Sequence, residues 1–208
     1  MSRRKTRGVK PNMERYKMRR AILLSGFNNW GKTTHIQSLF GRSNFYKGYL
    51  FGVPNVNASF TVESHSNDDL LEVRFVNVVT NKIAASPDGG ANIFCAFCLS
   101  REPNNDSRRI LTSAPFATYD KIHVILLQYK WDFHAELRIQ DITNYLSPIP
   151  HVMLFTVNAD RNLTIDTQRA SARETQIIWF SSPNNLPLMT ITLFRVFAST
   201  HDASVALP

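Results

Sequence analysis

The feature that most constrains the fold is an apolar run joined by a glycine-containing loop to a stretch with helical spacing. The run, residues 21–26, reads AILLSG, and so short a continuous apolar run is typical of a strand buried on both faces of a parallel sheet. In residues 32–41, Ile36, Leu39 and Phe40 have helical spacing, and Gly41 stands where a helix is expected to end. The sequence therefore predicts the first strand–helix unit of an α/β domain.

The loop between strand and helix, GFNNWGKTT at residues 26–34, matches the pattern G-x-x-x-x-G-K-[ST]. A buried strand before this loop and a helix after it are the context in which the pattern binds phosphates. On this motif the chain resembles the P-loop NTPase superfamily over its first third, without resembling one subfamily. The resemblance implies a three-layer α/β/α domain with a largely parallel central sheet, which binds ATP or GTP together with Mg²⁺.

Each residue type in the loop has a physical role in such a site. Gly26 lets the chain turn sharply out of the strand, and Gly31 lets the backbone approach the phosphates. Lys32 would reach the β- and γ-phosphate oxygens, the Thr33 hydroxyl would bind Mg²⁺, and Thr34 would lie near the α-phosphate. The expected nucleotide-binding residues of the loop are Gly26, Asn28, Asn29, Trp30, Gly31, Lys32, Thr33 and Thr34.

Trp30 departs from the common pattern, in which a small residue often precedes the second glycine. A bulky indole at this place must point away from the phosphates. Two interpretations remain open for Trp30. The ring either lines the base, the ribose or a partner, or is buried against the sheet.

A second acid, which would complete the Mg²⁺ shell or orient water in a hydrolase, has no obvious place in the sequence. Glu102 comes two positions late after its predicted strand, and Asp88 precedes its strand in the turn signal SPDGG. For both Asp88 and Glu102, a purely structural role in a turn is the alternative interpretation. With Lys32, Asp88 and Glu102 are the candidate catalytic residues.

The rest of the chain alternates strand-like and helix-like segments, which favours an α/β domain. Residues 59–66 and 70–79 are predicted as neighbouring strands joined by a turn at 67–69. Further strands are predicted at residues 91–100, 121–129, 151–158 and 175–182. Helices are predicted within residues 107–120 and at 132–148, and residues 187–200 fit a strand or a terminal helix.

The two cysteines, Cys95 and Cys98, form a C-x-x-C in an apolar strand, where positions three apart point to opposite faces. Without a second cysteine pair, a four-thiolate zinc site is excluded. We expect buried core thiols, which suit a reducing compartment. His123, in the middle of a predicted strand, is likewise expected to be a core histidine.

The net charge of +8 is concentrated at the N-terminus. The first twenty residues hold nine of the 24 Lys and Arg residues and one of the 16 acidic residues, which leaves fifteen of each sign in the remainder. We therefore expect a flexible basic tail over residues 1–20 and a single domain over 21–208. The tail could contact nucleic acid, an anionic membrane surface or an acidic partner.

No secretory signal and no apolar run of about 20 residues is visible, so a soluble cytoplasmic protein is expected.

Four functions are compatible with the loop. The preferred one is a Mg²⁺-dependent NTPase, with ATP favoured over GTP, whose nucleotide state regulates a protein partner or homo-oligomer. A GTPase-like switch would read guanine through Lys130 and Asp132, although Tyr129 replaces the Asn of the N-K-x-D motif that this stretch resembles. A small-molecule kinase would clamp phosphates with Arg169 and Arg173, four apart on a helix. The fourth is a degenerate subunit that binds nucleotide for structure only.

Overall fold

The computed structural model describes residues 18–26, 28, 30–54, 56–127, 129–130, 133–134 and 138–157. Its main sheet contains β1 (Arg20–Ser25), β2 (Phe51–Gly52), β3 (Ser59–Glu63), β4 (Asn92–Phe97), β7 (Lys121–Leu127) and β10 (Val152–Val157). Two small hairpins are formed by β5 (Arg101–Glu102) with β6 (Asn105–Asp106), and by β8 (Tyr129–Lys130) with β9 (Phe133–His134). The helices are α1 (Lys32–Phe40), α2 (Asn67–Leu70), α3 (Glu72–Ala85), α4 (Ser107–Thr112), α5 (Ala114–Ala117) and α6 (Ile139–Leu146).

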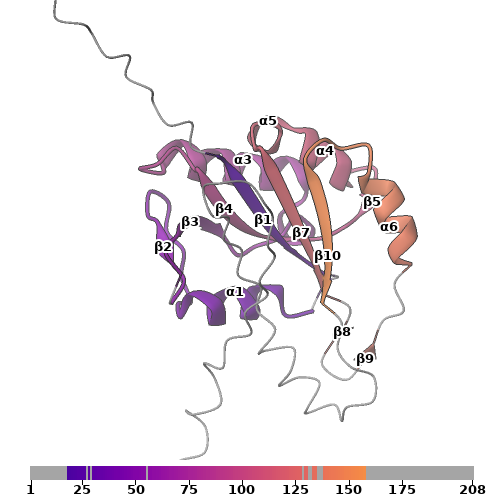
Figure 1. The fold of residues 1–208 in the computed structure, drawn as a ribbon, viewed down its shortest axis with the longest axis horizontal. Helices are drawn as coiled ribbons and strands as arrows, with labels where there is room; N and C mark the ends of the chain where they lie inside the picture. The colour runs from indigo at the N-terminus through magenta and orange to yellow at the C-terminus, as the bar shows by residue number, and fades with distance from the viewer. Residues whose placement is uncertain are drawn as a thin grey trace, which may run out of the picture.

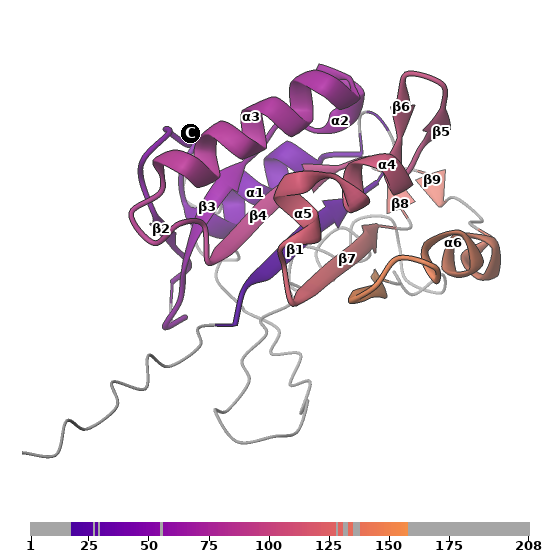
Figure 2. The same cartoon turned by 90° about the horizontal axis from the view of Figure 1, so that it is seen from above.

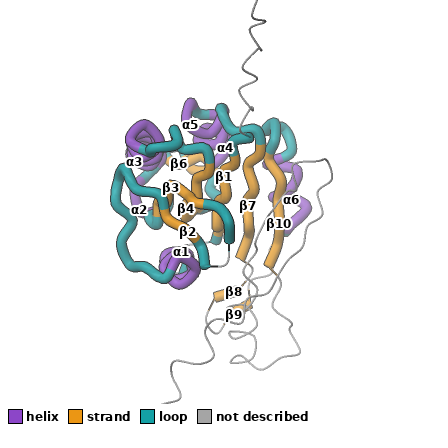
Figure 3. Tube along the Cα trace, turned by 60° about the vertical axis from the view of Figure 1, so that its left-hand side comes forward, coloured by secondary structure: helices purple, strands orange, loops and turns teal. Residues whose placement is uncertain are grey.

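The main sheet has the order β10-β7-β1-β4-β3-β2. Every neighbouring pair from β10 to β3 is parallel, and only β2 pairs with β3 in the antiparallel direction. Figure 3 shows β7 and β10 side by side, with α6 next to β10. The protein is therefore a mixed α/β fold with a largely parallel central sheet, as the sequence predicts.

Helices cover both faces of this sheet (Figures 1 and 2). On one face, Ile36 and Phe40 of α1 pack in a cluster with Leu24 of β1. On the other face, α3, α4, α5 and α6 pack in a second cluster, to which β1 contributes Leu23. Neighbouring side chains of β1 thus enter opposite cores, as the two-residue period of a strand requires.

The continuous apolar runs behave as predicted. The strands expected at 91–100, 121–129 and 151–158 are confirmed as β4, β7 and β10, and the run at 21–26 is confirmed as β1. β1 begins at Arg20, the last residue of the predicted tail. Short helices α4 and α5 lie within 107–120, as expected.

One strand prediction is wrong. Residues 70–79 do not form a strand beside β3, because Glu72–Ala85 is the helix α3, and the predicted turn at 67–69 is the short helix α2. The expected common face of Leu71, Val73 and Phe75 does not exist. Phe75 is fully buried, whereas Leu71 and Val73 are 57% and 73% exposed. Phe75 and Val79, four apart, form the buried stripe of the helix.

The helix predicted at 132–148 is confirmed only for Ile139–Leu146, since residues 133 and 134 belong to the strand β9. Some predictions lie outside the described residues. They concern the basic tail over residues 1–17, the segments 175–182 and 187–200, and Arg169 and Arg173. Among the described residues, no helix combines the length and the apolar character that crossing a bilayer requires.

The direction of the strands determines where loops meet. The carboxyl ends of β1, β3, β4 and β7 lie at one edge of the sheet, because these strands are parallel and in register. The chain leaves β1 at that edge, where the Gly26 N–H donates to the Phe97 carbonyl of β4 at 3.3 Å. Loops that follow β1, β3 and β4 can therefore build one site.

His123 is buried in β7, with its ring 5.8 Å from that of Phe155, which confirms the expected core position. Burial, with the nearby charges of Lys121 and Arg20, lowers the pKa of His123 to about 4. An unfolded chain protonates this imidazole near pH 6.5. Between these values the unfolded state binds more protons, so stability must fall as the pH drops.

We expect His123→Leu to remove that acid sensitivity. The wild-type protein should lose up to about 1.4 kcal/mol of unfolding free energy per pH unit between pH 6.5 and 4.5, and the variant should lose clearly less. Urea denaturation at several pH values measures this slope. His151→Asn, which removes an exposed histidine, should keep the wild-type slope. An equal slope in all three proteins contradicts the assignment.

Candidate phosphate-binding site

The loop after β1 has the backbone that its glycines predict. Gly31 has φ +75° and ψ +17°, left-handed values that favour glycine, and it precedes the first residue of α1. The His35 N–H donates to the Gly31 carbonyl at 2.9 Å and closes the first turn of α1. The loop therefore ends on a helix whose first amide groups face the carboxyl edge of the sheet.

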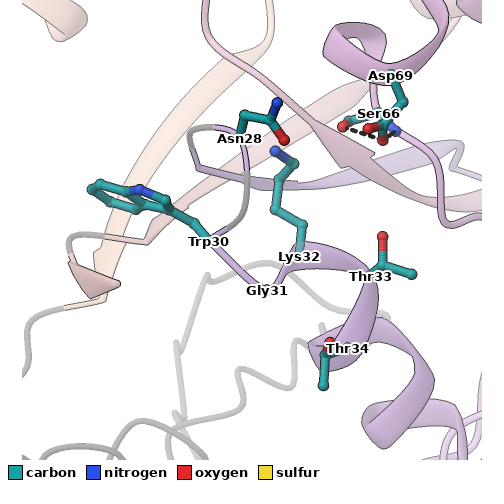
Figure 4. A pocket seen from close by; sticks show the side chains of 8 residues that line it. All are labelled: Asn28, Trp30, Gly31, Lys32, Thr33, Thr34, Ser66 and Asp69. Atoms are coloured by element: carbon teal, nitrogen blue, oxygen red, sulfur yellow. Dashed lines mark hydrogen bonds between the residues drawn. The ribbon is translucent and has the colours of Figure 1, made fainter. Parts of the chain in front are cut away.

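A cavity of about 310 Å³ opens at this helix end. It is lined by Asn28, Trp30, Gly31, Lys32, Thr33, Thr34, Ser66 and Asp69. Figure 4 shows the Lys32 side chain extending toward Asn28, with Ser66 and Asp69 across the cavity. All but the last two residues come from the loop and α1, so the structure brings six residues of the predicted phosphate loop to one cavity, while Gly26 is not part of its lining. Asn29 lies outside the described residues.

Lys32 is almost fully buried, with 6% of its surface exposed. Its Nζ donates to the Gly26 carbonyl at 2.9 Å and to Asp68 Oδ2 at 3.2 Å. A buried ammonium without an acidic partner would be strongly unfavourable. Asp68 is that partner, and the ion pair holds the Lys32 ammonium in a poorly solvated place at the cavity wall.

Thr33 lies beside Lys32 and has a defined hydroxyl direction. Its Oγ1 donates to the Ser64 carbonyl at 2.8 Å, just after the end of β3. A hydroxyl that donates its one proton to a carbonyl keeps its oxygen lone pairs for another partner. Thr33 is thereby suited to bind a cation.

The acids at this site, Asp68 beside Lys32 and Asp69 at the cavity wall, come from α2 and are not among the candidates from sequence. Ser66 and Asp69 form a capping box in which the Ser66 N–H and Oγ each donate to Asp69 Oδ2 at 2.9 Å. The Ser66 hydroxyl also contacts Asp68 Oδ1. The signal was available, because Ser followed three residues later by an acid marks a helix start.

Asn67 fixes α2 to the end of β4. Its Nδ2 donates to the Cys98 carbonyl at 3.0 Å and to Asn105 Oδ1 at 2.7 Å, and its Oδ1 accepts the Cys98 N–H at 2.7 Å. The side chain is fully buried. These three bonds determine where Asp68 and Asp69 stand relative to Lys32.

The acids proposed from sequence are not at the cavity. Asp88 lies at the opposite edge of the sheet, in the turn before β4, where its Oδ1 accepts from Ser86 Oγ at 2.7 Å and the Gly90 N–H at 3.0 Å. Glu102 is exposed in the β5–β6 hairpin. Neither lines the cavity, and Asp88 acts as the turn residue that was its alternative interpretation.

Trp30 is buried, as the second of its two interpretations predicts. It is 7% exposed and packs in the α1-side core, and it also contributes to the cavity wall. In Figure 4 its ring extends away from Lys32. Lys130 lies in the short strand β8 after β7, and Asp132 lies outside the described residues.

Cys95 and Cys98 are buried and free, as expected of core thiols. Burial raises the pKa of the Cys98 thiol to about 11, and that of Cys95 is raised further by the same cause. Both therefore remain thiols at neutral pH. Within the described ranges, no three His, Cys, Asp or Glu side chains gather closely enough to hold a metal ion by themselves.

A buried ion pair holds the end of β3, from which Ser64 reaches Thr33. Lys82 Nζ lies 3.0 Å from Glu63 Oε2 and donates to the carbonyls of Phe45 and Val62 at 2.9 and 2.6 Å. Burial alone would raise the pKa of Glu63, but Lys82 and the hydrogen bonds from His65 lower it below its usual value. The stabilisation is thus present above about pH 4.5 and is lost as the pH falls through the folded pKa.

Comparisons of the chain with protein families, with curated proteins and with solved structures found no match. The chemistry of the cavity is therefore inferred from its own residues.

We expect Lys82→Met to destabilise the protein by about 3–5 kcal/mol, because it leaves the Glu63 carboxylate buried without its cation. The double variant Lys82→Met/Glu63→Leu removes both charges and should recover most of that loss. Urea unfolding at pH 7 measures both. If the double variant is no more stable than the single one, the ion pair is not what stabilises this end of β3.

Proposed function

We propose that the cavity binds the phosphates of a nucleoside triphosphate with Mg²⁺, that the protein hydrolyses this nucleotide, with ATP preferred, and that the nucleotide state regulates a partner complex. The observation that carries the proposal is the position of the Lys32 ammonium. It is buried beside the start of α1, at the wall of a cavity that also presents the Thr33 hydroxyl. A fixed cation, helix amide groups and a glycine backbone are together the chemistry that recognises phosphate.

The residues present fit a hard divalent cation. Mg²⁺ prefers oxygen ligands and usually combines one or two protein groups with phosphate oxygens and waters. The Thr33 hydroxyl, directed by its bond to Ser64, and the exposed Asp69 carboxylate across the cavity supply such oxygens. When bound, Mg²⁺ would neutralise phosphate charge. Asp69 in this role would take the place of the second acid that Asp88 and Glu102 do not provide.

The first test is thermal unfolding with Mg²⁺ and ATP, GTP or no nucleotide. A ligand at 100 times its dissociation constant stabilises the native state by about 2.7 kcal/mol. We expect such a shift for the wild type and none for Lys32→Ala, each compared with its own ligand-free transition. Lys47→Ala, which removes an exposed lysine in the loop after α1, should keep the wild-type shift. An undiminished shift in Lys32→Ala would show that nucleotide binds elsewhere.

Turnover is tested by phosphate release. We expect Asp69→Asn to lower the rate about 10- to 100-fold, because Asp69 orients the metal and its waters. Asp88→Asn and Glu102→Gln should keep wild-type rates, since both residues lie away from the cavity. If either control loses activity and Asp69→Asn does not, the catalytic acid is Asp88 or Glu102 and not Asp69.

The same assays separate the alternatives. Binding without phosphate release supports a structural nucleotide subunit. Release that requires an added acceptor supports a small-molecule kinase. A preference for GTP that Asp132→Asn abolishes supports the guanine-reading switch.

A further inference from the structure

Asp68 occupies the position on Lys32 where a phosphate oxygen would bind. The ammonium has three protons, of which one goes to the Gly26 carbonyl and one to Asp68 Oδ2. A carboxylate and a phosphate oxygen are equivalent acceptors for that second proton. Asp68 and a nucleotide phosphate therefore compete for the same atom.

Electrostatics makes this competition exclusive. Asp68 and Asp69 are adjacent on α2, and the Ser66 hydroxyl contacts both carboxylates. If a phosphate reached Lys32 with Asp68 still in place, the phosphate and the Asp68 carboxylate would repel each other in a poorly solvated pocket. Asp69, which is exposed and lines the cavity, can still bind the metal from the rearranged segment, whereas Asp68 must move away from Lys32.

The residue that ends α2 is in a strained backbone conformation. Leu71 has φ +62° and ψ +160°, a combination that almost only glycine adopts. Its side chain is 57% exposed, so burial does not hold it there. The strain is maintained by α3, since the Leu71 carbonyl accepts the Phe75 N–H at 2.9 Å, and by contacts of the neighbouring residues.

Those contacts lie on both sides of a four-residue segment. Before it, Asn67 is bonded to Cys98 and Asn105. After it, Glu72 accepts the Asp106 N–H at 2.9 Å and forms an ion pair with Arg109 at 2.6 Å. Residues 68–71, which we call the switch segment, thus run between two fixed points and contain both the Lys32 partner and the strained residue.

We infer that the switch segment is a nucleotide-sensing element: phosphate binding displaces Asp68 from Lys32, and the segment then rearranges and releases the strain at Leu71. This inference rests on the proposed function and names its means of regulation. The two fixed points limit the change to residues 68–71. The exposed Leu71 side chain moves with the segment. Nucleotide binding therefore changes the outer surface of the protein, where a partner could detect the change.

The test compares two adjacent acids. ATP affinity is measured with Mg²⁺ by calorimetry for the wild type, Asp68→Asn and Asp69→Asn. We expect Asp68→Asn to bind ATP about tenfold more tightly, since it removes the competitor for Lys32. Asp69→Asn should bind more weakly, because it removes a metal ligand. A general effect of negative charge would tighten both variants, and a metal role for both acids would weaken both; either result overturns the inference.

A second comparison keeps the charges intact. Leu71→Gly removes the strain that favours rearrangement, so it should weaken ATP binding about threefold or more. Leu71→Ala keeps a Cβ and the strain, and should bind as the wild type does. Equal affinities for the two Leu71 variants overturn the inference while the proposed function stands. If the wild type itself binds no nucleotide, the proposed function fails and the inference fails with it.

Discussion

The arrangement of the molecule depends on the parallel pairing of β1 along both of its edges. Its backbone is bonded to β4 on one side and β7 on the other, and its side chains are buried on both faces. Because all three strands run in the same direction and start in register, the loops that follow them emerge at one edge. β3 pairs with β4 in the same direction and delivers α2 to that edge. The parallel direction of these strands therefore determines where the cavity lies, and the side chains of the loops determine its lining.

The parts of the fold that could be predicted are those whose sequence allows one interpretation. Continuous apolar runs such as ILL at residues 22–24 can only be buried on both sides. Residues 70–79 failed because their pattern is ambiguous: Phe75 and Val79 are four apart, and residues four apart share a face in a strand and in a helix alike. The deciding information lay outside the segment, in the capping box of Ser66 and Asp69, which identifies a helical start.

The candidate site likewise has a part that the sequence predicts and a part that it does not. Residues 26–34 are contiguous, so their pattern alone predicted a loop of which six residues line the cavity. Asp68 and Asp69 were missed because their place opposite Lys32 depends on the sheet order β1-β4-β3, in which β4, later in the chain, lies between two earlier strands. The position of β4 between β1 and β3 cannot be predicted from the local sequence. Asp88 and Glu102 were chosen for their closeness to strands in sequence, which says nothing about the edge at which they lie.

The bonds of Asn67 have a consequence for how the cavity comes into being. The wall opposite Lys32 is held by Cys98 and Asn105, 31 and 38 residues after Asn67 in the chain. A nascent chain that ends before Cys98 has the loop and α1 but lacks all three hydrogen-bond partners of Asn67. The cavity is completed only after β4 and the β5–β6 hairpin have docked, so occupancy of the cavity would report the assembly of the central sheet rather than of its first strand–helix unit.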